Sequence, residues 1–300
     1  MFFSIVLAIA TGLAMAAQSP TNTSLGFTVG SLQASLTNFA VGLVLCVLLV
    51  LTIGQGDISL ALSCPAWQLI GGAYGVVILT CIVISTPKLG VALMIAMSML
   101  GQLVAGVVID QFGLAGATVV PVTPLRLAGC LVAAGGIYLV YKGTSTSANL
   151  DSGKQKAYLL LPFCGAAIAS LQPSTNAALG ATIGSIEASC VNFIVGTFIL
   201  LVLVLVTNKG RLKSYKGAKA WQFTGGCYGA FAVLSMIVGS PAIGIGLWNV
   251  CTMLGQLVGG MAVDTFGLFT MSKRSINSKR VAGAALVLCG IVIVAIAKML

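Results

Sequence analysis

Long apolar stretches alternate with short polar segments along the whole chain, and this pattern predicts membrane-spanning helices. Most of the stretches reach the ~20 residues that a helix needs to cross the hydrocarbon core of a bilayer. Because backbone groups in lipid must pair within their own segment, we expect helices rather than isolated strands. Prolines mark the expected turns, among them Ser19-Pro20 and Pro173. The ten expected helices lie at 2–18, 31–53, 67–86, 89–109, 127–142, 157–172, 185–207, 221–240, 243–263 and 281–298.

The composition agrees with a chain that faces lipid. Hydrophobic residues make up 58% of the chain and charged residues 7%, whereas a soluble domain carries roughly 25% charge. Segment 2–18 ends in small residues, like a signal peptide, but it lacks a basic beginning and has a counterpart in mid-chain. We therefore interpret it as a retained helix, and the fold class as an all-α integral membrane protein.

The second half of the chain repeats the first. Shifted by 154 residues, the sequence matches itself without a gap, and Met99–Val104 recurs unchanged at Met253–Val258. A match this long in one register indicates duplication. It divides the chain into a first five-helix repeat at 1–143, a linker at 144–156 and a second repeat at 157–300. Other equivalent pairs are Gln18 and Gln172, Asn22 and Asn176, Asn38 and Asn192, Gln102 and Gln256, Asp110 and Asp264, and Arg126 and Arg280.

An odd number of helices per repeat turns the second copy upside down in the membrane, and the charges support this. Segments 54–66 and 110–126 carry one basic residue, whereas their second-half counterparts carry nine. Basic loops stay on the cytoplasmic side, so equivalent loops of the two repeats should lie on opposite sides. Threading all ten helices places thirteen basic residues on one side and only Arg126 and Lys298 on the other. We expect a multi-pass inner (plasma) membrane protein with both termini extracytoplasmic and a cytoplasmic linker at 144–156.

Several kinds of chemistry are disfavoured by the sequence. The chain has no histidine, which removes Ser-His-Asp catalysis and most zinc sites. Its nine cysteines form no C-x-x-C pair, and we interpret them as packing residues. The net charge of +10 lies in short tracts between apolar runs, so we do not expect a nucleic-acid partner. The sequence also lacks a G-x-x-x-x-G-K-[ST] phosphate loop. We expect no enzyme, no cofactor and no metal.

Two strings of residues resemble a known transporter family. The pattern G-V-A-L…G-Q-L…D-x-F-G-L runs from Gly90 to Leu114, and its echo, beginning G-I-G-L, runs from Gly244 to Leu268. Together with the Trp-Gln…Gly-Gly…Tyr-Gly segments of each repeat, they are similar to YdcZ-type inner-membrane exporters of the drug/metabolite transporter (EamA-like) superfamily. The resemblance implies a ten-helix fused form with inverted repeats, and it implies no particular substrate. Better-known ten-helix relatives keep both termini cytoplasmic, and the charge count of this chain departs from that pattern.

Glu187 is the one acidic residue that falls inside an expected helix, near the start of 185–207. A carboxylate in the membrane is costly and is by default a functional hypothesis. We expect Glu187 to bind a proton or a cationic substrate. The alternative is a helix end that faces water, where an acid favours the N-terminal dipole. Its counterpart in the first repeat is Gln33.

Repeated amide side chains form the second group of candidates. Asn22 and Asn176 follow expected helices beside prolines, where a broken helix end can hold a ligand or the side chain can cap a turn. The other amides lie within expected helices, where they form interhelical hydrogen bonds or line a substrate path. We interpret Asp110 and Asp264, which end their helices, as anchors of the following turns. The candidate substrate-binding or coupling residues are Glu187, Gln33, Asn22, Asn176, Asn38, Asn192, Gln102 and Gln256.

Together these features predict a secondary membrane transporter, an exporter of a small metabolite or drug-like solute that works by alternating access. Inverted repeats place the substrate site at their interface, near the membrane midplane. The expected partners are the lipid bilayer, a small-molecule substrate and a proton or cation as coupling ion, in a monomer or homodimer. The alternative is a pseudo-symmetric channel, which would show high flux without saturation.

Overall fold

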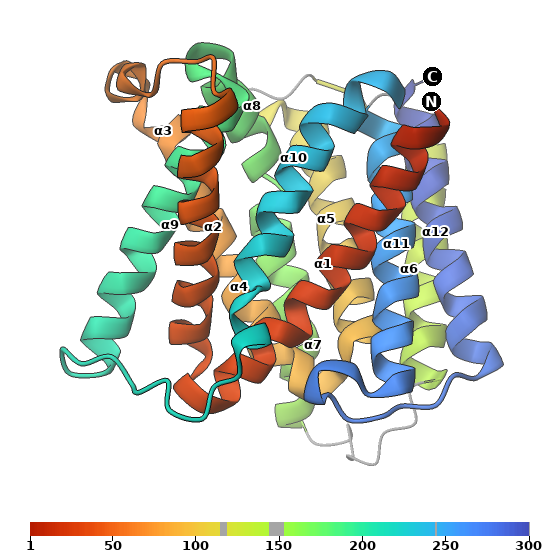
Figure 1. Ribbon diagram of the computed structural model, residues 1–300. Coiled ribbons are helices and arrows are strands. Elements are labelled where there is room, and N and C mark those ends of the chain that lie inside the picture. The colour runs from red at the N-terminus through yellow and green to blue at the C-terminus, as the bar shows by residue number, and fades with distance from the viewer. Residues whose placement is uncertain (115–118, 144–152, 244, 300) are drawn as a thin grey trace.

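The chain is folded as a bundle of helices (Figure 1). The computed structural model describes residues 1–114, 119–143, 153–243 and 245–299, and within these ranges every regular element is a helix. By length and hydropathy, eight helical segments of the described residues could cross a membrane. The composition and the apolar pattern therefore predicted the fold class correctly, as an all-α membrane protein.

The first half contains six α-helices and one short 3-10 helix among the described residues. They are α1 (Phe2–Val29), α2 (Ser31–Ile53), η1 (Ile58–Ser63), α3 (Ala66–Leu69), α4 (Gly71–Leu89), α5 (Val91–Phe112) and α6 (Pro124–Gly143). The second half follows the same order with α7 (Gly153–Ala169), α8 (Gln172–Ile183), α9 (Ser185–Thr207), η3 (Ala220–Phe223), α10 (Gly225–Ile243), α11 (Ile245–Phe266), η4 (Leu268–Thr270) and α12 (Ser278–Met299).

The first expected helix, 2–18, was predicted too short. Helix α1 continues through Pro20 to Val29, so Asn22 lies inside a helix rather than after one. Proline lacks the N–H that would pair one turn back, but membrane helices tolerate it where neighbouring groups satisfy the freed backbone. The segment around Pro20 is buried against other helices, and Thr21 Oγ1 donates a hydrogen bond to the Ala17 carbonyl at 2.8 Å.

The equivalent helix of the second half is broken. Helix α7 ends at Ala169 and α8 begins at Gln172. The ring of Pro173 would clash with the carbonyl four residues earlier, which is that of Ala169. The break therefore falls where the proline requires it, and the expected end at residue 172 was wrong by about one turn.

The two ends of the bundle differ in what they carry. Both termini lie at one end, at the top of Figure 1, together with η1, α3 and α8. We call this the terminal end. Segment 208–219 and η4 lie at the opposite end, which we call the basic end because its loops include Lys209, Arg211, Lys213, Lys216, Lys219, Lys273 and Arg274. Most of the expected linker at 144–156 lies outside the described residues, and α7 begins at Gly153.

Glycines allow the helices to approach each other closely. A Cβ on Gly136 of α6 would lie 2.6 Å from the Gly283 carbonyl of α12, and a Cβ on Gly283 would lie 2.6 Å from the Gly136 carbonyl. Gly129 and Gly290 form the same reciprocal contact about two turns away from Gly136 and Gly283. Small residues at helix interfaces are the usual means of close packing in membranes, so α6 and α12 join the two halves backbone to backbone.

Candidate functional site

Helices α2 and α9 meet at a pair of phenylalanines, one from each half of the chain. The rings of Phe39 and Phe193 are 5.5 Å apart at an interplanar angle of 61°, an edge-to-face contact that aromatic pairs favour. A Cβ on Gly196 would collide with the Phe39 ring, and one on Gly42 would collide with the Phe193 ring. Because these residues are equivalent in the two halves, the contact brings the repeats together at matching positions.

A first amide cluster lies beside this aromatic pair and consists of Gln18 and Asn22 of α1 and Asn38 of α2. Asn38 Oδ1 accepts hydrogen bonds from Asn22 Nδ2 at 3.0 Å and from Gln18 Nε2 at 3.1 Å. Asn22 and Asn38 are 1% and 4% exposed. Both asparagine Oδ1 atoms face Gly225, at the start of α10 from the other half.

A second amide cluster consists of the equivalent residues Gln172 and Asn176 of α8 and Asn192 of α9. Here the bond between the asparagines has the opposite direction, because Asn192 Nδ2 donates to Asn176 Oδ1 at 2.7 Å. Both Oδ1 atoms face Gly71, at the start of α4. Asn192 is 7% exposed, and its Oδ1 has no hydrogen-bond partner within the described residues.

The two amide clusters lie on either side of the aromatic pair. A Cβ on Gly75 of α4 would lie 3.0 Å from the Phe39 ring and 3.4 Å from Gln172 Nε2. A Cβ on Gly229 of α10 would lie 3.3 Å from Gln18 Nε2 and 3.8 Å from the Phe193 ring. Four of the predicted residues, the asparagines, thus meet as two pairs. The sequence reasoning left out Gln18 and Gln172 as site residues, although their equivalence under the 154-residue shift was a usable signal.

Gln33 and Glu187 occupy equivalent places in the first turns of α2 and α9, where each holds a loop of the other half. Gln33 exchanges two hydrogen bonds with the Lys213 backbone, of 2.9 Å to the carbonyl and 2.8 Å from the N–H. Glu187 Oε1 accepts a 2.8 Å bond from the Gly56 N–H. Both side chains are buried, at 1% and 2% exposure. Glu187 precedes Asn192 by five residues, or roughly 8 Å along the helix, so its expected role in binding a proton or cation stays a prediction.

Gln102 and Gln256 lie on α5 and α11, next to α7 and α1. Gln256 Nε2 donates to the Met15 sulfur at 3.5 Å, which is a weak contact. The side chain of Gln102 is exposed, while its backbone carbonyl accepts a long bond from Ser170 Oγ at 3.5 Å. In the part of the chain that the structure describes, no hydrogen bond joins either residue to the amide clusters, and their predicted part in a site stays a prediction.

Two buried ion pairs anchor the loops that follow α5 and α11, and the sequence reasoning identified only their acidic partners as anchors. Arg126 donates to Asp110 at 2.6 Å, and Arg280 donates to Asp264 at 2.5 Å. Each arginine also binds two carbonyls of its own loop, those of residues 120 and 121 or of residues 274 and 275. A buried pair needs such additional bonds to offset the loss of hydration.

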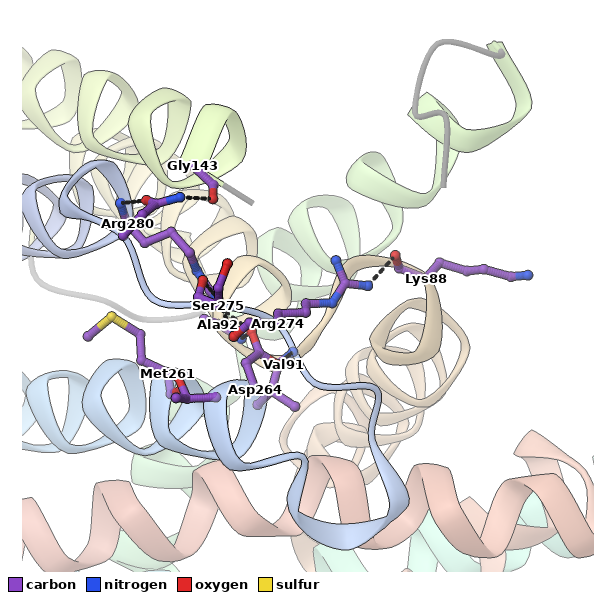
Figure 2. A network of polar contacts seen from close by, with 11 residues as sticks. Lys88, Val91, Ala92, Gly143, Met261, Asp264, Arg274, Ser275 and Arg280 are labelled. Atoms are coloured by element: carbon purple, nitrogen blue, oxygen red, sulfur yellow. Dashed lines mark hydrogen bonds and ion pairs between the residues drawn. The ribbon is translucent and has the colours of Figure 1, made fainter. Parts of the chain in front are cut away.

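The Asp264 pair also connects the two halves (Figure 2). Its carboxylate accepts the N–H of Val91 at 2.7 Å and that of Ala92 at 3.2 Å, at the N-terminus of α5, where a negative charge is favoured by the helix dipole. Arg274 of the same loop donates to the Lys88 carbonyl at 3.1 Å. Burial lowers the pKa of the Arg274 guanidinium, and the nearby Asp264 carboxylate opposes that shift.

Further hydrogen bonds close the basic end over α1 and α2. Gln222 of η3 donates to Ser24 Oγ at 2.7 Å, and Ser24 in turn contacts Thr270 of η4 at 2.9 Å. The hydroxyls of Thr37 and Tyr215 are 2.9 Å apart. At the terminal end the equivalent of Gln222 is Gln68, and its buried Oε1 has no partner within the described residues. Within the described residues, the basic end is therefore joined by more side-chain hydrogen bonds between the halves than the terminal end.

Comparison with known proteins adds the family. No curated protein matches the chain. The sequence model of the family described as "Putative inner membrane exporter, YdcZ" matches residues 3–139 and again residues 157–293. Both the first and the last residues of the two matches are 154 apart (157 − 3 and 293 − 139), which is the spacing of the internal repeat. The chain, a multi-pass membrane protein whose two halves each match the family model, therefore belongs to the YdcZ family of inner membrane exporters.

Proposed function

We propose that the protein is a secondary transporter that exports a small metabolite or drug-like solute by alternating access, with ten spans arranged as two inverted five-helix halves. Membership of an exporter family supports export. The placement of equivalent loops at opposite ends of the bundle, such as 54–66 at the terminal end and 208–219 at the basic end, supports the inversion (Figure 1).

The observation that carries the proposal is the pair of equivalent amide clusters on either side of Phe39 and Phe193. Inverted repeats in transporters bind substrate where the repeats meet, often beside a discontinuous helix. Both conditions hold at the second cluster, which follows the break between α7 and α8. Rocking of the halves about the aromatic pair would open one cluster to each side of the membrane in turn.

The orientation follows from the charges. The basic end faces the cytoplasm under the positive-inside rule, so both termini are extracytoplasmic. The more complete hydrogen bonding of the basic end is then that of a conformation closed toward the cytoplasm. The linker at 144–156 joins the two repeats, 1–143 and 157–300, on the cytoplasmic side.

Coupling to a proton or cation is assigned to Glu187. It is a buried carboxylate. Within the described residues it accepts one hydrogen bond, from the Gly56 N–H, and it forms no ion pair with a basic side chain. Glu187→Gln removes the charge and preserves the hydrogen bond. An amide oxygen can still accept a bond from the Gly56 N–H, as Gln33 Oε1 accepts one from the Lys213 N–H. The variant should fold normally and lose the pH dependence of transport.

The proposal is tested by current measurements on proteoliposomes adsorbed to a solid-supported membrane and challenged with amino acids, organic cations, sugars and organic acids. A saturable current for one class is expected, with loss of at least tenfold in Asn38→Ala or Asn192→Ala. A current that never saturates would contradict a carrier and indicate a channel. A saturable current with unchanged pH dependence in Glu187→Gln would remove Glu187 as the coupling residue.

A further inference from the structure

The two amide clusters have the same residues but different hydrogen bonding. In the first cluster, Asn38 Oδ1 accepts hydrogen bonds from both Gln18 Nε2 and Asn22 Nδ2, while Asn22 Oδ1 accepts none from a described residue. In the second cluster, Asn192 Oδ1 accepts none, and the Gln172 side chain makes no hydrogen bond to a described residue. A buried carbonyl without a partner costs free energy, so the difference requires an explanation.

The orientation of the amides does not remove the difference. If the oxygen and nitrogen of both Asn176 and Asn192 were exchanged, their mutual bond would survive and Asn192 Nδ2 would lack an acceptor instead. Buried hydroxyls without a partner also occur in the first half, at Thr23 and Ser35. A hydroxyl can rotate toward a carbonyl of its own helix, whereas the Asn192 amide cannot. The difference that needs an explanation is therefore that Gln18 donates to Asn38, whereas Gln172 donates to no described residue and Asn192 Oδ1 stays without a partner.

The available donor and acceptor of the second cluster lie along one face of α4. Asn192 Oδ1 faces Gly71, and Gln172 Nε2 faces Gly75, one turn or about 6 Å further along the helix. Asn176 is half-buried, whereas its equivalent Asn22 is 1% exposed, and Gln18 and Gln172 are both half-buried. The second cluster thus directs one hydrogen-bond acceptor and one set of donors toward the same face of α4, and its Asn176 is less buried than the equivalent Asn22 of the first cluster.

Among the described residues, the lining of this cluster is uncharged. It consists of amides, the glycines of α4 and the Phe39 ring, and the nearest acid along α9, Glu187, bonds to Gly56. A cation would lack a counter-charge here, and an anion would lack a basic side chain. We propose, on the basis of the function argued above, that Gln172, Asn176 and Asn192 bind the polar group of an uncharged solute that carries both a hydrogen-bond donor and an acceptor oxygen.

The proposal is tested by thermal unfolding of the purified full-length protein in detergent with three probes that share one carbon skeleton: isobutyramide, isobutyrate and isobutylammonium. A ligand that binds only the folded state raises the melting temperature in a saturable way. We expect a saturable rise with the neutral amide and none with the two ions. Asn192→Ala should weaken the amide response roughly tenfold in concentration, the equivalent of one lost hydrogen bond. Asn208→Ala, at the other end of α9, is the matched control and should respond as the wild type.

Unfolding without a probe gives a second reading. Asn38→Ala leaves two donors without an acceptor and should lower the melting temperature more than Asn192→Ala, which removes one bond. Equal losses, an equal response to the ions, or an unchanged amide response in Asn192→Ala would each overturn the inference. The assay measures binding and not flux, so a negative result here would not contradict the transporter proposal. Conversely, absence of flux despite binding of the amide would contradict the transporter proposal alone.

Discussion

At the scale of single residues, the buried Asp264–Arg280 pair connects α11, α12 and their loop with the N-terminus of α5. The carboxylate holds Arg280 and two N–H groups of α5, and Arg280 holds two carbonyls of its loop. Both side chains are 1% exposed. We expect Asp264→Asn to destabilise the protein by roughly 3–5 kcal/mol, because it leaves the Arg280 charge buried without its partner. Thermal unfolding of the purified variant measures this loss.

Asp57→Asn is the matched control, since Asp57 is an exposed residue whose side chain bonds only to Ser59 within the described residues. It should unfold like the wild type. In addition, Asp264→Leu combined with Arg280→Leu should lose less stability than the sum of the two single changes, because coupled residues are not additive. Strict additivity would show that the ion pair does not carry the stability.

The individual site residues could be predicted only in part. The asparagines were found because they repeat at equivalent positions within apolar stretches, and they do meet as two pairs. Gln18 and Gln172 share that repetition but were not counted as site residues. The unequal bonding of Asn38 and Asn192 could not be predicted, because the two residues have similar neighbours in sequence and differ through packing of distant segments.

At the scale of elements, the α6–α12 contact depends on which side of α6 a glycine faces. A Cβ on Gly136 would meet the backbone of Gly283 and Val287 at 2.6 Å, whereas a Cβ on Gly135 would meet nothing within 4 Å. Gly135→Ala should be neutral or stabilise the protein by up to about 1 kcal/mol, since alanine favours a helix. Gly136→Ala should destabilise it by about 1–3 kcal/mol through overpacking. Thermal unfolding of these adjacent variants checks the interface, and a reversed order would contradict it.

Prolines show how far element boundaries follow from the sequence. The segments Gln18–Asn22 and Gln172–Asn176 differ by the order of serine and proline and were both expected to break a helix. Only the second does, and α1 remains continuous through Pro20. Helix α1 is enclosed by α10, α11, η3 and η4, so tertiary packing stabilises a helix that the local sequence disfavours. Propensity alone could not separate the two cases.

At the scale of the whole molecule, the repeat was the most informative feature of the sequence. The 154-residue shift of the internal repeat is the spacing at which the family model matches twice. Charge then distinguishes the two copies, because the loops at 208–219 and 271–277 are basic and their first-half counterparts are nearly uncharged. An inverted pair of equal halves would insert in either orientation without such a bias. Under the proposed orientation, the basic loops both direct the insertion of the protein and join the two halves at the cytoplasmic end.

This orientation can be tested directly with reporter fusions. Alkaline phosphatase is active only outside the cytoplasm, and green fluorescent protein exported in unfolded form fluoresces only inside it. Fused after Leu300, phosphatase should be active and the fluorescent protein dark. Fused to a truncation ending at residue 147, within the linker, the fluorescent protein should be bright. Replacing Lys209, Arg211 and Lys213 with glutamine should weaken this bias, because it removes three of the thirteen basic residues expected on the cytoplasmic side. If both fusion points report the same side, the second half crosses the membrane an even number of times, and the inverted five-helix repeat is wrong whatever the substrate.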